Sequence, residues 1–76
     1  MGMMVAGRKV AETEHEVRYE FDVDRRFDRV LTIDKQSWRA VPDDGNFDSA
    51  AGAVATKVKR SWEQQGTFPP GVVFSS

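Results

Sequence analysis

A chain of 76 residues is enough for one small domain, and its formal net charge of −1 lacks the basic surplus usual in nucleic-acid-binding proteins. The absence of cysteine excludes disulfides, and a single histidine argues against a four-ligand zinc site. No apolar run approaches the length of a membrane span or of a signal peptide. We therefore expect a cytoplasmic protein that is stabilised by packing, by a partner or by self-association.

The beginning of the chain is loosely patterned. Val5, Ala6 and Val10 are too sparse among its methionines, glycines and charges to define an amphipathic face. We expect residues 1–14 to form a flexible N-terminal leader and residues 15–76 to form a single small α+β domain.

Two runs of alternating apolar and polar residues follow, a pattern typical of strands with one buried face. The first occupies residues 17–23 and the second residues 29–34. The polar residues 24–28 between them suit a hairpin connection. The two runs are therefore predicted to pair antiparallel, with these apolar positions facing one another: Tyr19, Phe21, Leu31 and Ile33.

A third, short strand is predicted over residues 38–41, after a turn at residues 34–37 that begins with an aspartate. Pro42 should end this strand, because proline cannot donate a hydrogen bond to a sheet ladder. Residues 72–74 are apolar and are expected to be extended, either as a fourth strand or as padding at the edge of the core.

Residues 47–66 carry the clearest helix pattern of the chain. Asp48 or Ser49 can cap the helix at its start, and Gly66 is well placed to end it. One face has apolar or small residues at helical spacing, including Trp62, and it is expected to cover the sheet as part of the core. The fold class predicted is α+β, with a three-stranded antiparallel sheet in the order β-β-β-α packed on one helix.

Reactive side chains are few. His15 is the only histidine, and its acidic neighbours suggest a solvated surface residue. No serine lies in a triad motif, and the glycines do not form a phosphate-binding loop. The spacing of a calcium loop is absent from the acidic set Asp22, Asp24, Asp28 and Asp34. We expect no catalytic residue, no metal and no cofactor, and predict that the protein is not an enzyme.

The back of the predicted helix carries small residues beside long basic side chains, which would let a partner backbone approach closely. This pattern favours a non-catalytic protein-interaction module, acting as a homodimer or as an accessory subunit. An unpaired sheet edge at residues 38–41 or 72–74 would be a second contact surface. The partner contacts predicted on the helix are Ala50, Ala53, Lys57 and Arg60.

The alternative is a nucleic-acid-binding accessory protein. Basic residues gather at the predicted hairpin and on the helix, and some DNA-binding domains read the major groove with strands. The acidic residues on the outer face of the hairpin weaken this interpretation. The contacts predicted under the alternative are Arg25, Arg26, Arg29, Lys57 and Arg60.

Overall fold

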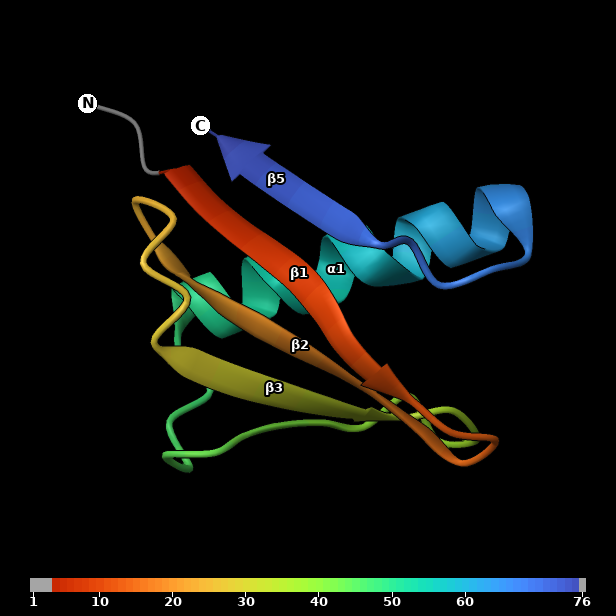
Figure 1. The fold of residues 1–76 in the computed structure, drawn as a ribbon. Helices are drawn as coiled ribbons and strands as arrows, with labels where there is room; N and C mark the ends of the chain where they lie inside the picture. The colour runs from red at the N-terminus through yellow and green to blue at the C-terminus, as the bar shows by residue number, and fades with distance from the viewer. Residues whose placement is uncertain (1–3, 76) are drawn as a thin grey trace.

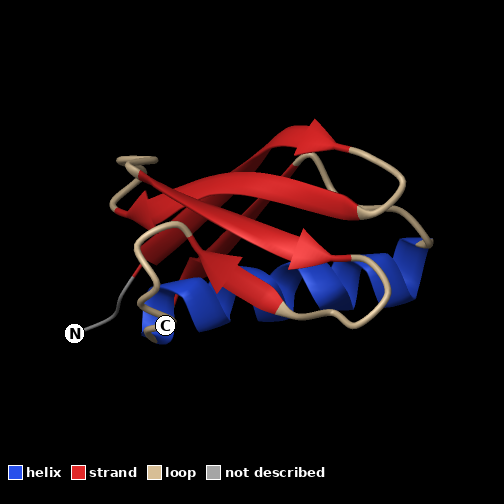
Figure 2. Cartoon of the chain, turned by 90° about the horizontal axis from the view of Figure 1, so that it is seen from below, coloured by secondary structure: helices blue, strands red, loops and turns tan. Residues whose placement is uncertain are grey.

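The structure, a computed structural model, describes residues 4–75 as an antiparallel sheet of five strands with one helix across one face (Figures 1 and 2). The strand order is β4-β3-β2-β1-β5, so β1 and β2 lie inside the sheet. The elements are β1 (Met4–Glu12), β2 (Glu16–Val23), β3 (Arg29–Asp34), β4 (Ala40–Pro42), α1 (Ser49–Gln65) and β5 (Gly71–Ser75). The α+β class is confirmed, but the sheet has five strands, where three were expected with residues 72–74 as a fourth strand or as padding at the edge.

Strand β1 is the main departure from the prediction. The expectation of a flexible leader is wrong for residues 4–12, which pair with β2 on one side and with β5 on the other. Alternation is hard to see in its sequence, because Gly7 occupies a position facing the helix and a bulge shifts the register between Lys9 and Ala11. The first part of the predicted leader, residues 1–3, lies outside the described residues.

The hairpin between β2 and β3 has the predicted pairing. Tyr19 lies opposite Leu31, and both side chains are fully buried on the face toward the helix. The short strand β4 pairs with β3 and ends at Pro42, which is buried opposite Leu31. Trp38 was expected in this strand but lies before it, with a φ of 62°.

Helix α1 begins and ends where its capping residues predict. The side chain of Asp48 accepts a hydrogen bond from the backbone N–H of Ala51, and this satisfies one of the free donors of the first turn. Gly66 closes the helix in the left-handed conformation, at a φ of 76°, and its N–H donates to the carbonyl of Trp62.

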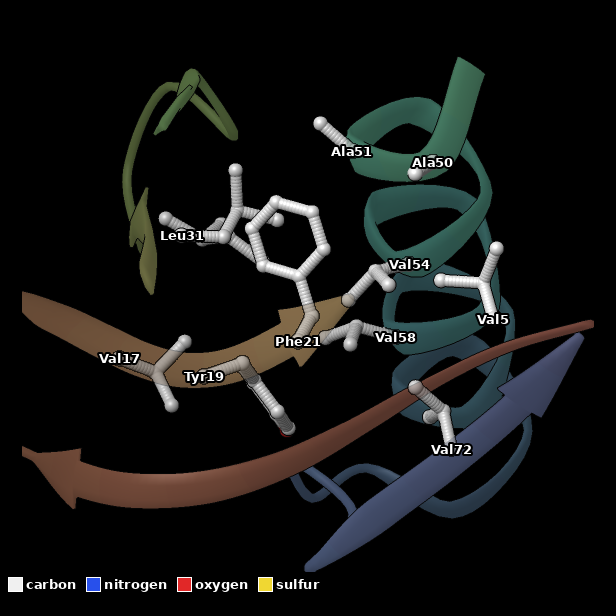
Figure 3. Close-up of a cluster of buried hydrophobic side chains, with 11 residues drawn as sticks. Val5, Val17, Tyr19, Phe21, Leu31, Ala50, Ala51, Val54, Val58 and Val72 are labelled. Carbon is white, nitrogen blue, oxygen red and sulfur yellow. The ribbon is translucent and has the colours of Figure 1, made fainter. Parts of the chain in front are cut away.

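The core lies between α1 and the sheet (Figure 3). Val54 and Val58 on the helix are fully buried, as are Tyr19 and Phe21 on β2. The Tyr19 hydroxyl donates to the carbonyl of Pro69 at 2.6 Å, which fixes the loop before β5 to the interior. Helix α1 therefore contacts β5, β1 and β2, and does not lie centrally over the three strands predicted from the sequence.

Candidate interaction site

The helix face that we predicted as a partner contact is not open. Ala50 is 4% exposed and Ala53 is 9% exposed, whereas Lys57 is half-buried and Arg60 is exposed. The reason is the width of the sheet. Because β1 and β5 also contact α1, more of the helix surface is buried than the three predicted strands could bury. The prediction that Ala50 and Ala53 meet a partner is therefore wrong in this folded state.

Arg29 is bound within the fold. Its side chain is 14% exposed and forms ion pairs with Asp44 at 2.9 Å and Asp48 at 3.0 Å. The guanidinium also lies 4.6 Å from the centre of the Phe21 ring. Burial alone would lower the pKa of Arg29, but the hydrogen bonds that its guanidinium donates to both carboxylates raise it above its ordinary value. Arg29 links the sheet to the helix and is poorly placed to bind a phosphate.

The other predicted nucleic-acid contacts form two groups. Arg25 and Arg26 are exposed in the turn between β2 and β3, at the end of the sheet near the start of α1 (Figure 1). Lys57 and Arg60 lie later along the helix. The structure therefore distributes the basic residues over separate elements and does not assemble them with Arg29 into one surface.

Within residues 4–75, strand β5 is an open edge of the sheet, because β1 is its only neighbour in the strand order. Its five residues, GVVFS, include no charge and no proline. Val72 points toward the core and is 9% exposed, while Val73 is 50% exposed on the opposite face. We call the outer side of residues 71–75 the β5 edge. The opposite edge, β4, is three residues long and contains a proline.

A shallow groove of about 410 Å³ lies beside the β5 edge. Its lining includes Ala6, Val73, Phe27 and the turn residue Arg25. The Arg8 guanidinium lies 4.3 Å from the centre of the Phe27 ring, so this ring is held over the sheet by a neighbouring strand. Partly apolar surface therefore continues from the edge onto the face of the sheet away from α1.

An aromatic cluster at the C-terminal end of α1 was not predicted from the sequence. Trp62 was expected in the core but is 38% exposed. Its ring centre lies 5.3 Å from that of Trp38 and 6.4 Å from that of Phe68. No periodic pattern marks this cluster, because Trp38 and Phe68 belong to connections between elements.

Reactive groups are sparse across residues 4–75. No group of three or more His, Cys, Asp or Glu side chains there is arranged to hold a metal ion. Within the same residues, no helix combines the length and the apolar character needed to cross a membrane. No family model matches the chain, and no match was found among curated proteins or solved structures.

Proposed function

We propose that this chain is a non-catalytic protein-interaction module that binds a second copy of itself through the β5 edge. The observation that carries the proposal is the open, uncharged strand β5 with Val73 half-exposed. An edge strand presents unpaired N–H and C=O groups that can pair with another strand. Monomeric proteins usually protect such edges with lysine, proline or a very short strand, and β5 has none of these features.

The absence of charge on β5 favours a second copy as the partner. In a two-fold antiparallel pairing, each residue of one edge meets a residue of an identical edge, so any charge near the axis would face a like charge. With GVVFS on both sides there is no such repulsion. A pairing centred on Val73 would place this valine against Val73 of the second copy and shield both side chains from water.

The proposal transfers the expected contact from the helix to the sheet edge. The nucleic-acid alternative stays a prediction, and no geometric feature favours it, since Arg29 is already bound by two carboxylates. A cytoplasmic location and the absence of catalysis likewise stay predictions. Under the proposal, two five-stranded sheets would join into one continuous sheet, with a helix of each copy on the face opposite Val73.

Sedimentation velocity over about a hundredfold range of concentration tests the proposal, because a dimer of this kind obeys mass action. Val73→Lys places a charge on the edge and should raise the dimer dissociation constant by more than about tenfold. Val41→Lys is the matched control, since Val41 is 49% exposed on the opposite edge strand, compared with 50% for Val73.

The expected result is a dimer for the unmodified chain and for Val41→Lys, and a monomer for Val73→Lys. A monomer at every concentration would overturn self-association. A dimer that Val73→Lys leaves intact, or that both lysine variants weaken equally, would exclude β5 as the contact.

A further inference from the structure

A second surface feature, separate from the β5 edge, is a pocket of about 500 Å³ where β1 ends. It is formed by the end of β1, the turn between β3 and β4, and the connection from α1 to β5. A volume of this size lies within the range of small-molecule sites. We call it the lysine–tryptophan pocket. The lining residues on which the argument rests are Lys9, Glu12, Lys35, Trp62 and Phe68.

One wall of the pocket is aromatic. Trp62 and Phe68 line it, and Trp38 supports both rings, lying 5.3 Å from each between ring centres. Because Trp62 is 38% exposed, part of this apolar surface remains accessible to a ligand. A flat ring can stack on such a wall or meet it edge to face.

Charged side chains also line the pocket. Lys9 Nζ lies 2.7 Å from Glu12 Oε1, and Lys35 Nζ lies 2.8 Å from Glu12 Oε2. Hydrogen bonds from Lys35 and then from Lys9 lower the pKa of Glu12, so this carboxylate is ionised at neutral pH. Two ammonium groups thus share one carboxylate, which leaves one positive charge uncompensated within the group.

Both ammonium groups keep capacity to bind. Lys9 Nζ uses a second donor on the carbonyl of Phe68 at 3.4 Å, whereas the hydrogen bond of Lys35 Nζ is to Glu12. An ammonium has three donors, so at least one remains on each lysine. Lys35 Nζ also lies 5.2 Å from the centre of the Phe68 ring, which brings the charge next to the aromatic wall.

We propose that the lysine–tryptophan pocket binds a small organic anion in which a flat apolar ring carries a carboxylate or phosphate group. The ring lies against Trp62 and Phe68, and the anionic group binds the free donors of Lys9 and Lys35. A cationic ligand fits less well, because the protein's own lysines already lie near the aromatic rings: Lys35 near Phe68 and Lys59 at 5.9 Å from the centre of Trp38.

NMR titration provides a local readout. The chain contains two tryptophans, and both Trp38 and Trp62 belong to this cluster, so both indole N–H resonances report on the pocket. The probes are benzoate and phenyl phosphate, which distinguish a carboxylate from a phosphate ligand. Benzamide tests the ring without the charge, and inorganic phosphate tests the charge without the ring. We expect one of the two ring-bearing anions to shift the indole signals more strongly than either comparison compound.

Variants separate an anion site from a purely structural ion pair. Lys9→Gln and Lys35→Gln should each weaken binding of the ring-bearing anion by about tenfold. Glu12→Gln should strengthen it, because a competing negative charge is removed while both ammonium groups remain. Lys57→Gln is the control, since Lys57 lies on the helix outside this pocket. Thermal melts show that each variant is folded at the temperature of the titration.

The proposal is overturned if neither ring-bearing anion shifts the indole signals, or if benzamide shifts them equally. Weaker anion binding by a folded Glu12→Gln variant would also contradict it. None of these outcomes depends on dimerisation through the β5 edge, which is tested separately by sedimentation.

Discussion

The Arg29 guanidinium on β3 donates hydrogen bonds to the carboxylate of Asp48, the N-cap of α1. Its Nη1 lies 3.1 Å from Oδ1 and 3.0 Å from Oδ2. The same Oδ1 accepts the backbone N–H of Ala51 at 3.0 Å. One carboxylate therefore caps the helix and ties its first turn to the sheet. This contact joins the start of α1 to β3, in addition to the packing of Val54 and Val58 on the sheet.

Replacement of Asp48 should separate the contribution of the helix cap to stability from that of the ion pair with Arg29. Asp48→Ala loses both and should lower the free energy of unfolding by about 1–2 kcal/mol. Asp48→Asn keeps an oxygen acceptor for Ala51 and should cost less than about 1 kcal/mol, because only the partly exposed ion pair is lost. Urea denaturation of both variants measures the difference, and equal losses would show that the cap contributes nothing.

Acid should destabilise the fold through carboxylates whose pKa is lowered. The hydrogen bond from Ala51, followed by that from Arg29, lowers the pKa of Asp48, and backbone N–H groups lower the pKa of Asp34 and Asp44. A pKa that is lower in the folded state adds stability above the unfolded value, about 3.9, and this stability is lost as pH falls through the folded value.

The free energy of unfolding should therefore be nearly constant around neutral pH and should fall below about pH 5. Asp48→Asn should show a shallower fall, because its amide does not titrate. Urea midpoints measured across the acid range provide the comparison. Parallel profiles for Asp48→Asn and the unmodified chain would contradict the role assigned to this carboxylate.

Two glycine substitutions should have opposite effects. A Cβ at Gly7 would lie 3.2 Å from Val54 Cγ1 and 3.3 Å from Val72 Cγ2, so Gly7→Ala should destabilise by about 1–3 kcal/mol. At Gly52 the nearest contact is Phe47 at 3.6 Å, an ordinary distance, so Gly52→Ala should stabilise the helix by about 0.5–1 kcal/mol. Thermal melting of both variants checks the signs, and a neutral Gly7→Ala would argue against close packing of β1 on the helix.

Deletion of residues 1–12 should abolish folding. These residues include the whole of β1, and β2 and β5 would lose their shared neighbour. The core would also lose Val5, which is fully buried. Far-UV circular dichroism and the dispersion of amide NMR signals provide the measurement. A truncated chain with native dispersion would restore the interpretation of this segment as a leader.

Helix α1 and the β2–β3 hairpin were predictable because their signals are local. Asp48 and Gly66 mark the helix ends, and the alternation of residues 17–23 marks a strand with one buried face. Strand β1 was not predictable in this way, since Gly7 and Lys9 occupy positions where an alternating pattern would show apolar side chains. The strand is defined by its neighbours on both sides, and such pairing is not local.

The error in the helix face follows from the missing strand. With three strands expected, Ala50 and Ala53 would lie outside the contact between helix and sheet. With β1 and β5 present they are buried. The two candidate surfaces likewise depend on non-local pairing. The β5 edge is open because, among the strands that the structure describes, β5 pairs with β1 alone. The lysine–tryptophan pocket brings together residues from β1, two connections and α1.

Amide hydrogen exchange, followed residue by residue at low and high protein concentration, tests the central claim most directly. Those amides of β5 that do not bond to β1 should exchange rapidly in dilute solution and become protected as concentration rises, whatever the register of the pairing. The amides of β4, at the opposite edge, provide the internal comparison and should not change. Equal exchange of the outer β5 amides at all concentrations would contradict pairing through this edge.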